Sequence, residues 1–95
     1  MSGEGIYQAV GKTIERVVIK EKVHGGNDPR NQVFLIFTDG TYYELYTSSE
    51  DMGFCGRVDT GDRDTVLRYM ADCMRVVYEG YLDENGKPVS KYIRG

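Results

Sequence analysis

The segment over residues 32–48 constrains the fold most, because it holds two β-prone runs around an Asp-Gly pair. Residues 33–37 are apolar, Asp39 and Gly40 follow, and residues 42–46 are rich in tyrosine. Asp-Gly between two such runs is the preferred two-residue type I′ turn, since both turn residues need a positive φ. We therefore predict a central hairpin over residues 32–48 with an Asp-Gly turn.

A two-residue turn places Phe37 opposite Tyr42 and Phe34 opposite Leu45, and this register sorts the side chains. One face is then expected to carry Phe34, Ile36, Tyr43 and Leu45, and the other Val33, Leu35, Phe37, Tyr42, Glu44 and Tyr46. Both faces are apolar or aromatic, so both need cover. The second face has three candidate covers: the N-terminal segment, a C-terminal hairpin or another chain.

The segment over about 63–79 has the spacing of an amphipathic helix. Its apolar residues recur at three- and four-residue steps, and Asp62 and Asp64 suit the positive end of a helix dipole. Those apolar residues are Val66, Leu67, Met70, Met74, Val77, Tyr78 and Tyr81. The polar residues Arg68, Asp72, Arg75 and Glu79 are expected on the exposed face. The predicted fold class is α+β, with a small antiparallel sheet of three to five strands packed by one main α-helix at about 63–79.

The remaining segments are short. Residues 12–23 are rich in β-branched side chains and predict a long strand. Its apolar residues do not keep to every second position, which indicates either a bulge or a strand that is apolar on both faces. Residues 24–31 form a loop by composition. Residues 6–10 are too few to separate a helical turn from a strand. For residues 81–93, a small terminal hairpin competes with a loose arm.

Length and composition exclude several classes. A chain of 95 residues makes a single domain, residues 1–95, which we expect to be loosest at residues 1–5 and 84–95. The longest apolar run, residues 33–37, is far too short to cross a membrane. The two cysteines predict a reduced, cytoplasmic protein rather than a disulfide scaffold.

The charge distribution argues against nucleic acid as a partner. The net charge is −3, and residues 32–64 carry two basic and seven acidic side chains. A nucleic-acid binder usually concentrates basic residues on one face. The acidic middle third is either an ordinary solvated surface or a patch that meets a basic partner.

The residues with reactive side chains are few and scattered. Cys55 and Cys73 lie apart in the sequence, and the only histidine, His24, lies in the expected loop. A nucleophilic thiol needs a base within reach, and a zinc site needs clustered ligands. We therefore expect no enzyme activity, no metal and no cofactor.

The first hypothesis for function is a small interaction protein of the regulator or inhibitor type, acting as a homodimer. The chain has eight tyrosines and no tryptophan, and tyrosine suits interfaces because it joins a large ring to a polar group. Glu44 lies between Tyr42 and Tyr46, so these three residues are the expected dimer contact. The rival cover for their face is the chain's own ends, residues 6–7 and 92–93.

The second hypothesis is a small-ligand binder, with an anion or a nucleotide as the ligand. Its pocket would lie between the sheet and the 24–31 loop. His24, Arg30 and Arg57 are the candidate binding residues, with Arg63 as another candidate, since arginine matches the geometry of a phosphate or carboxylate.

Overall fold

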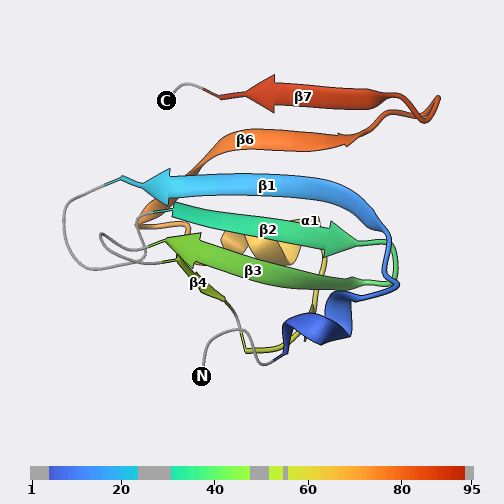
Figure 1. Ribbon diagram of the computed structural model, residues 1–95. Coiled ribbons are helices and arrows are strands. Elements are labelled where there is room, and N and C mark those ends of the chain that lie inside the picture. Colours follow the sequence, from blue (N-terminus) through green and yellow to red (C-terminus); the bar gives the residue numbers. More distant parts are fainter. Residues whose placement is uncertain (1–4, 24–30, 48–51, 55, 94–95) are drawn as a thin grey trace.

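The protein folds around one twisted antiparallel sheet (Figure 1). The computed structural model describes residues 5–23, 31–47, 52–54 and 56–93. Six strands follow the order β4-β3-β2-β1-β6-β7 across the described part of the chain, and β5 pairs with β3. The strands are β1 (Ile14–Lys22), β2 (Asn31–Phe37), β3 (Thr41–Thr47), β4 (Met52–Phe54), β5 (Asp59–Thr60), β6 (Met74–Leu82) and β7 (Pro88–Tyr92).

The predicted α+β class, its sheet of three to five strands and its main helix over about 63–79 are wrong. Helix α1 spans only Arg63–Arg68, and the second half of the predicted helix is strand β6. The segment that forms β6 contains Val76, Val77 and Tyr78, which are residue types that prefer strands. The spacing of its apolar residues fits both the helical period and the two-residue period of a strand. Pairing with distant strands decides between them, because β1 provides backbone partners along most of β6 and β7 provides them along its second half, Tyr78–Leu82.

Local chemistry explains why α1 is short. Asp62 caps its start: its Oδ1 accepts from the backbone N–H of Thr65 at 3.2 Å, while the Thr65 hydroxyl accepts from the Asp62 N–H at 3.3 Å. Beyond the helix, Met70 has a left-handed φ of 54°. The Met70 carbonyl accepts from the N–H of Met74 at 2.9 Å, which turns the chain into β6. Met74 is buried and Arg75 is exposed, as predicted, but they alternate along a strand.

The smaller predictions fare better. The long strand over residues 12–23 is confirmed as β1, and its register shifts against both β2 and β6. Residues 81–93 form the terminal hairpin of β6 and β7 rather than a loose arm. Residues 6–10 begin with the 3₁₀ turn η1 (Ile6–Ala9). Of the loop predicted over residues 24–31, residues 24–30 lie outside the described residues, and Asn31 is the first residue of β2.

The central hairpin is confirmed, but its predicted register is off by one residue. Ile36 lies opposite Tyr42 and Phe34 lies opposite Glu44, so the loop holds three residues. Gly40 has a positive φ of 81°, whereas Asp39 is not among the residues with positive φ. A three-residue loop with glycine in the left-handed position is the next most common hairpin connection.

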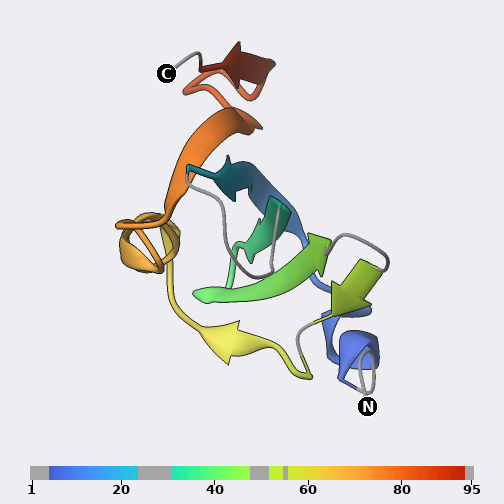
Figure 2. The ribbon, with the colours of Figure 1, turned by 90° about the vertical axis from the view of Figure 1, so that its left-hand side faces the viewer.

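This shift moves every side chain of β3 to the opposite face. We call the face toward α1 the inner face and the other the outer face. From the strand registers, the inner face carries Arg16, Val18, Lys20, Gln32, Phe34, Ile36, Tyr42, Glu44, Tyr46 and Glu79. The outer face carries Val17, Ile19, Val33, Leu35, Phe37, Tyr43, Leu45, Tyr78, Leu82 and Tyr92. Figure 2 shows α1 on one side of the sheet and η1 on the other.

One buried apolar cluster lies between the sheet and α1, while Phe37 and Tyr43 are buried on the outer face. Val18, Phe34 and Ile36 pack with Val66, the buried residue of the helix. Burial of apolar surface at this point holds α1 on the inner face. Val76 of β6 packs against this cluster, whereas β7 lies away from it, at the end of the molecule (Figure 2).

Candidate interaction surface

The three residues predicted as a dimer contact lie on the inner face, where each meets its own chain. The ring of Tyr42 packs against Phe34, with 6.1 Å between ring centroids. The ring of Tyr46 covers Gly53 so closely that a Cβ on this glycine would lie 2.3 Å from it. Glu44 accepts from Gln32 Nε2 at 2.7 Å. All three side chains thus contact their own chain while staying partly exposed, and their role in a dimer contact stays a prediction.

Glu44 belongs to a buried polar cluster under α1. The side chains of Lys20 and Gln32 are almost fully buried, and the Lys20 ammonium donates to the carbonyl of Tyr69. Burial raises the pKa of Glu44, although the hydrogen bond from Gln32 and the charge of Lys20 oppose this shift. Burial also lowers the pKa of Lys20. Gln32 Oε1 is buried without a partner among the described residues. Lys20 and Gln32 are buried, Glu44 is half-buried, and their hydrogen bonds within the fold fit a structural role.

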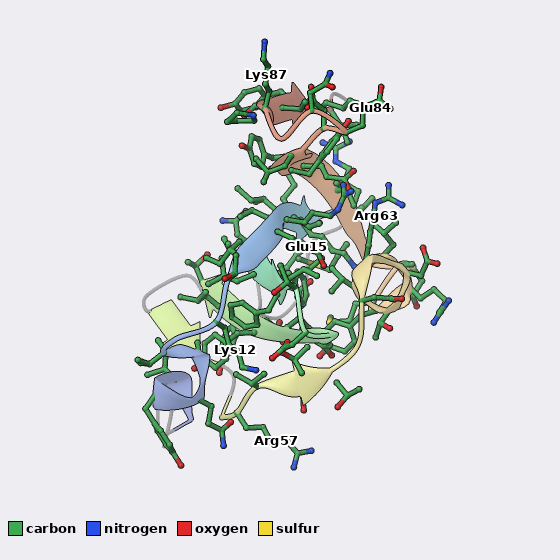
Figure 3. All side chains as sticks on the ribbon, turned by 90° about the vertical axis from the view of Figure 1, so that its right-hand side faces the viewer. Lys12, Glu15, Arg57, Arg63, Glu84 and Lys87 are labelled. Carbon is green, nitrogen blue, oxygen red and sulfur yellow. The ribbon has the colours of Figure 1, made fainter. Side chains whose placement is uncertain are left out.

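A second ionic group lies on the inner face at β6. Glu79, predicted to be exposed, has only 6% of its surface exposed. It accepts from Arg16 of β1 and from Arg63 of α1, whose Nη2 lies 3.3 Å from Glu79 Oε1. Figure 3 shows Arg63 on the side of the molecule where α1 meets β6. Hydrogen bonds from Arg63 and Arg16 hold the pKa of Glu79 below its usual range. This carboxylate joins the helix to two strands.

The residues predicted for a small-ligand pocket are only partly described. His24 and Arg30 lie outside the described residues, so that pocket stays a prediction. Arg57 is exposed, and its Nε donates to Asp59 at 3.0 Å. Arg63, the other candidate, binds Glu79. Figure 3 shows Arg57 at the end of the molecule opposite to Glu84 and Lys87.

The described residues also bear on metal and membrane binding. They contain no cluster of side chains that could hold a metal ion. Cys73 is a free thiol near the Met70 carbonyl, and Cys55 lies outside the described part. Within the same residues, no helix is both long and apolar enough to cross a membrane.

The sequence reasoning missed the outer face of the β6–β7 hairpin, because it assigned most of β6 to a helix. Here large apolar side chains meet solvent: Leu82 is 55% exposed and Tyr92 is 80% exposed. Tyr92 makes an edge contact with Tyr78, with ring centroids 5.0 Å apart, and the Tyr78 hydroxyl lies 2.9 Å from Ser90 Oγ. These contacts hold Tyr92 and Ser90 in place on the surface.

A shallow groove lies beside these residues, where the start of β1 meets the end of β6 and the start of β7. Its volume is about 230 Å³. Gly80 is among its lining residues, and the Tyr78 hydroxyl lies over this glycine, 2.6 Å from where a Cβ would be. The lining includes Ile14, Val17, Tyr78, Leu82, Pro88 and Ser90. The groove is thus mostly apolar.

The backbone of β7 provides the other half of this surface. Ile93 N–H donates to the Val77 carbonyl at 2.8 Å, and Asp83 N–H donates to the Lys87 carbonyl at 2.9 Å. Backbone groups alternate in direction along an antiparallel strand, so the N–H and C=O groups of the odd-numbered residues of β7 point toward β6. The backbone groups of residues 88, 90 and 92 point away from it. No strand of the described chain pairs with β7 on that side.

We call this edge, with the side chains of Leu82 and Tyr92, the β7 surface. It combines unpaired backbone donors and acceptors with exposed apolar side chains, which is the pattern that strand addition uses. The opposite edge of the sheet, β4, is only three residues long. No protein-family model, curated protein or solved structure matches this chain.

Proposed function

We propose that this chain acts without catalysis, by binding another protein chain along the β7 surface. The observation that carries the proposal is the outward direction of the backbone at Ser90 and Tyr92, at an edge without a described neighbour. An added strand would satisfy these groups through main-chain hydrogen bonds. The exposed rings and side chains next to them would supply apolar contact area.

The rest of the described chain supports a binding role over a catalytic one. Lys20 and Glu79 are buried, Glu44 is half-buried, and each of these charged groups is bonded within the fold. Catalytic groups instead converge on a cleft that substrate can reach. We further propose a cytoplasmic location, which the low number of cysteines supports.

Two features of β7 limit which strands can add to it. Pro88 has no N–H, so a partner strand finds one donor fewer at this end. Lys91 adds a positive charge on the other face of the strand, and charge at an edge opposes unspecific pairing. Such limits are expected of an edge that selects its partner.

The test compares Ser90→Pro with Ser90→Ala. The Ser90 N–H points away from β6, so proline removes a donor from the free edge and leaves the β6–β7 bonds in place. Alanine removes only the hydroxyl. We expect tagged wild type and Ser90→Ala, purified from cells that naturally make the chain, to retain a protein that Ser90→Pro loses.

Quantitative mass spectrometry of the purified material measures which proteins each variant retains. Differently tagged copies of the chain are included so that a retained second copy is also detected. Retention of the same partner by Ser90→Pro would contradict binding through β7. Failure of the wild type to retain any protein, its own second copy included, would contradict the binding function itself.

A further inference from the structure

We propose that the partner at the β7 surface is a second copy of this chain, paired β7 to β7 about a twofold axis at Ser90. The proposal rests on the binding function proposed above and names its partner. In this arrangement the two sheets join edge to edge. An isologous contact of this kind is the commonest way in which soluble proteins form dimers.

The outward backbone groups match in this register. Ser90 of each copy donates to the carbonyl of Ser90 of the other, which completes a hydrogen-bonded pair. Tyr92 of each copy donates to the carbonyl of Pro88 of the other. The missing N–H of Pro88 falls at the end of the ladder, where the carbonyl left over stays in water.

The neighbouring registers are worse. Sliding one strand so that Ser90 faces Tyr92 keeps the backbone bonds but sets Lys91 directly opposite Lys91, and like charges in that position are destabilising. Sliding it the other way sets Ser90 opposite Pro88 in both copies, so each such pair lacks a donor. In the register centred on Ser90, Lys91 lies opposite Val89 instead. The sequence of β7 thus selects one register for self-pairing.

Side chains on the outer face also match. Within one copy Leu82 lies opposite Pro88, and Tyr78 lies opposite Tyr92. Pairing about Ser90 places Pro88 of one copy opposite Tyr92 of the other. A continuous apolar row then crosses the joined sheet, from Leu82 and Pro88 to the two tyrosines of the second copy. The twofold axis repeats this row, so both exposed Tyr92 rings gain cover.

The first experiment is sedimentation equilibrium over a range of protein concentrations. We expect wild type and Ser90→Ala to dimerise with similar constants, and Ser90→Pro to dimerise at least about 10-fold more weakly, since it loses the central donors. Circular dichroism checks that Ser90→Pro is folded. As a matched control, Val89→Pro removes an N–H that faces β6, so it should lower the melting temperature more than Ser90→Pro does.

The second experiment fixes the register and does not depend on a proline variant. In a parent chain carrying Cys55→Ser and Cys73→Ser, single cysteines are placed at Ser90 or Lys91 and oxidised. Directly opposed residues of a hydrogen-bonded pair have Cα atoms about 5.5 Å apart, within disulfide range. Lys91 and its copy are diagonal neighbours, about 7–8 Å apart. We expect Ser90→Cys to form the covalent dimer and Lys91→Cys not to.

Efficient cross-linking through Lys91→Cys instead would overturn the Ser90 register. A wild type that stays monomeric at high concentration, with no cross-link through Ser90→Cys, would overturn self-pairing. If that monomer still retains another protein that Ser90→Pro loses, the binding function stands and only the second copy is wrong. The two proposals therefore fail separately.

Discussion

Replacing Phe34 with alanine should lower the free energy of unfolding by about 3–5 kcal/mol. The ring is fully buried, and it contacts Tyr42 and Tyr69 with ring centroids 6.1 Å away in each case. It lies in the cluster that seats Val66 of α1 on the sheet. Because small domains are stable by only about 5–15 kcal/mol, this loss would remove much of the total.

The matched control is Leu35→Ala, one position along β2. Leu35 lies on the outer face and is only partly buried, so its truncation leaves a smaller cavity and should cost less. Urea denaturation followed by circular dichroism measures both variants. A loss for Leu35→Ala that equals or exceeds the loss for Phe34→Ala would contradict the assignment of the inner face to the core.

Replacing Glu79 with glutamine should lower the free energy of unfolding at neutral pH by about 1–2 kcal/mol, because its charged hydrogen bonds weaken while both arginines stay partly solvated. Arg63 and Arg16 hold the pKa of Glu79 below its usual range. A carboxyl with a lowered pKa in the folded state stabilises the fold above its unfolded pKa, about 4.3. Wild type should therefore lose its advantage as the pH falls through the folded pKa.

Glu44→Gln is the control, with the opposite dependence on pH. Burial raises the pKa of Glu44, so its ionisation weakens the wild-type fold as the pH rises from the usual glutamate value to the raised one. As the pH rises over that range, Glu44→Gln should gain stability relative to wild type. As the pH rises from the lowered pKa of Glu79 to the usual glutamate value, Glu79→Gln should lose stability relative to wild type. Chemical denaturation between about pH 3 and pH 7 measures both slopes. If the stability difference from wild type changed with pH in the same direction for both variants, the opposite environments assigned to Glu44 and Glu79 would be contradicted.

The sequence predicts the strands around the central hairpin well, because their β-branched and aromatic runs are long and bounded by clear turn residues. It does not predict the register. The loop is held by contacts from distant segments: Thr38 N–H donates to the Thr13 carbonyl at 3.0 Å, and the Gly40 carbonyl accepts from Gly61 at 2.9 Å. Such contacts do not show in the local pattern of Asp39 and Gly40, and one residue of error exchanges the two faces.

The helix was the larger error, and its cause is physical. In β6, Met74, Val77 and Tyr81 have helical spacing, but Val76 and Tyr78 complete a strand pattern as well. The choice depends on neighbours that are distant in sequence, since β1 lies more than 50 positions before its partner residues. Because the sequence pattern assigned most of β6 to a helix, it could not predict the free edge at β7. It indicated the tyrosines of β3 as the interaction surface instead.

The most direct test of the β7 surface is backbone hydrogen exchange measured residue by residue at low and high protein concentration. The N–H groups of Val89 and Lys91 face β6, and those of Ser90 and Tyr92 face outward. We expect Val89 and Lys91 to be protected at both concentrations, and Ser90 and Tyr92 to become protected only at the high one. Equal, rapid exchange of Ser90 and Tyr92 at both concentrations would contradict pairing of this edge with a second copy.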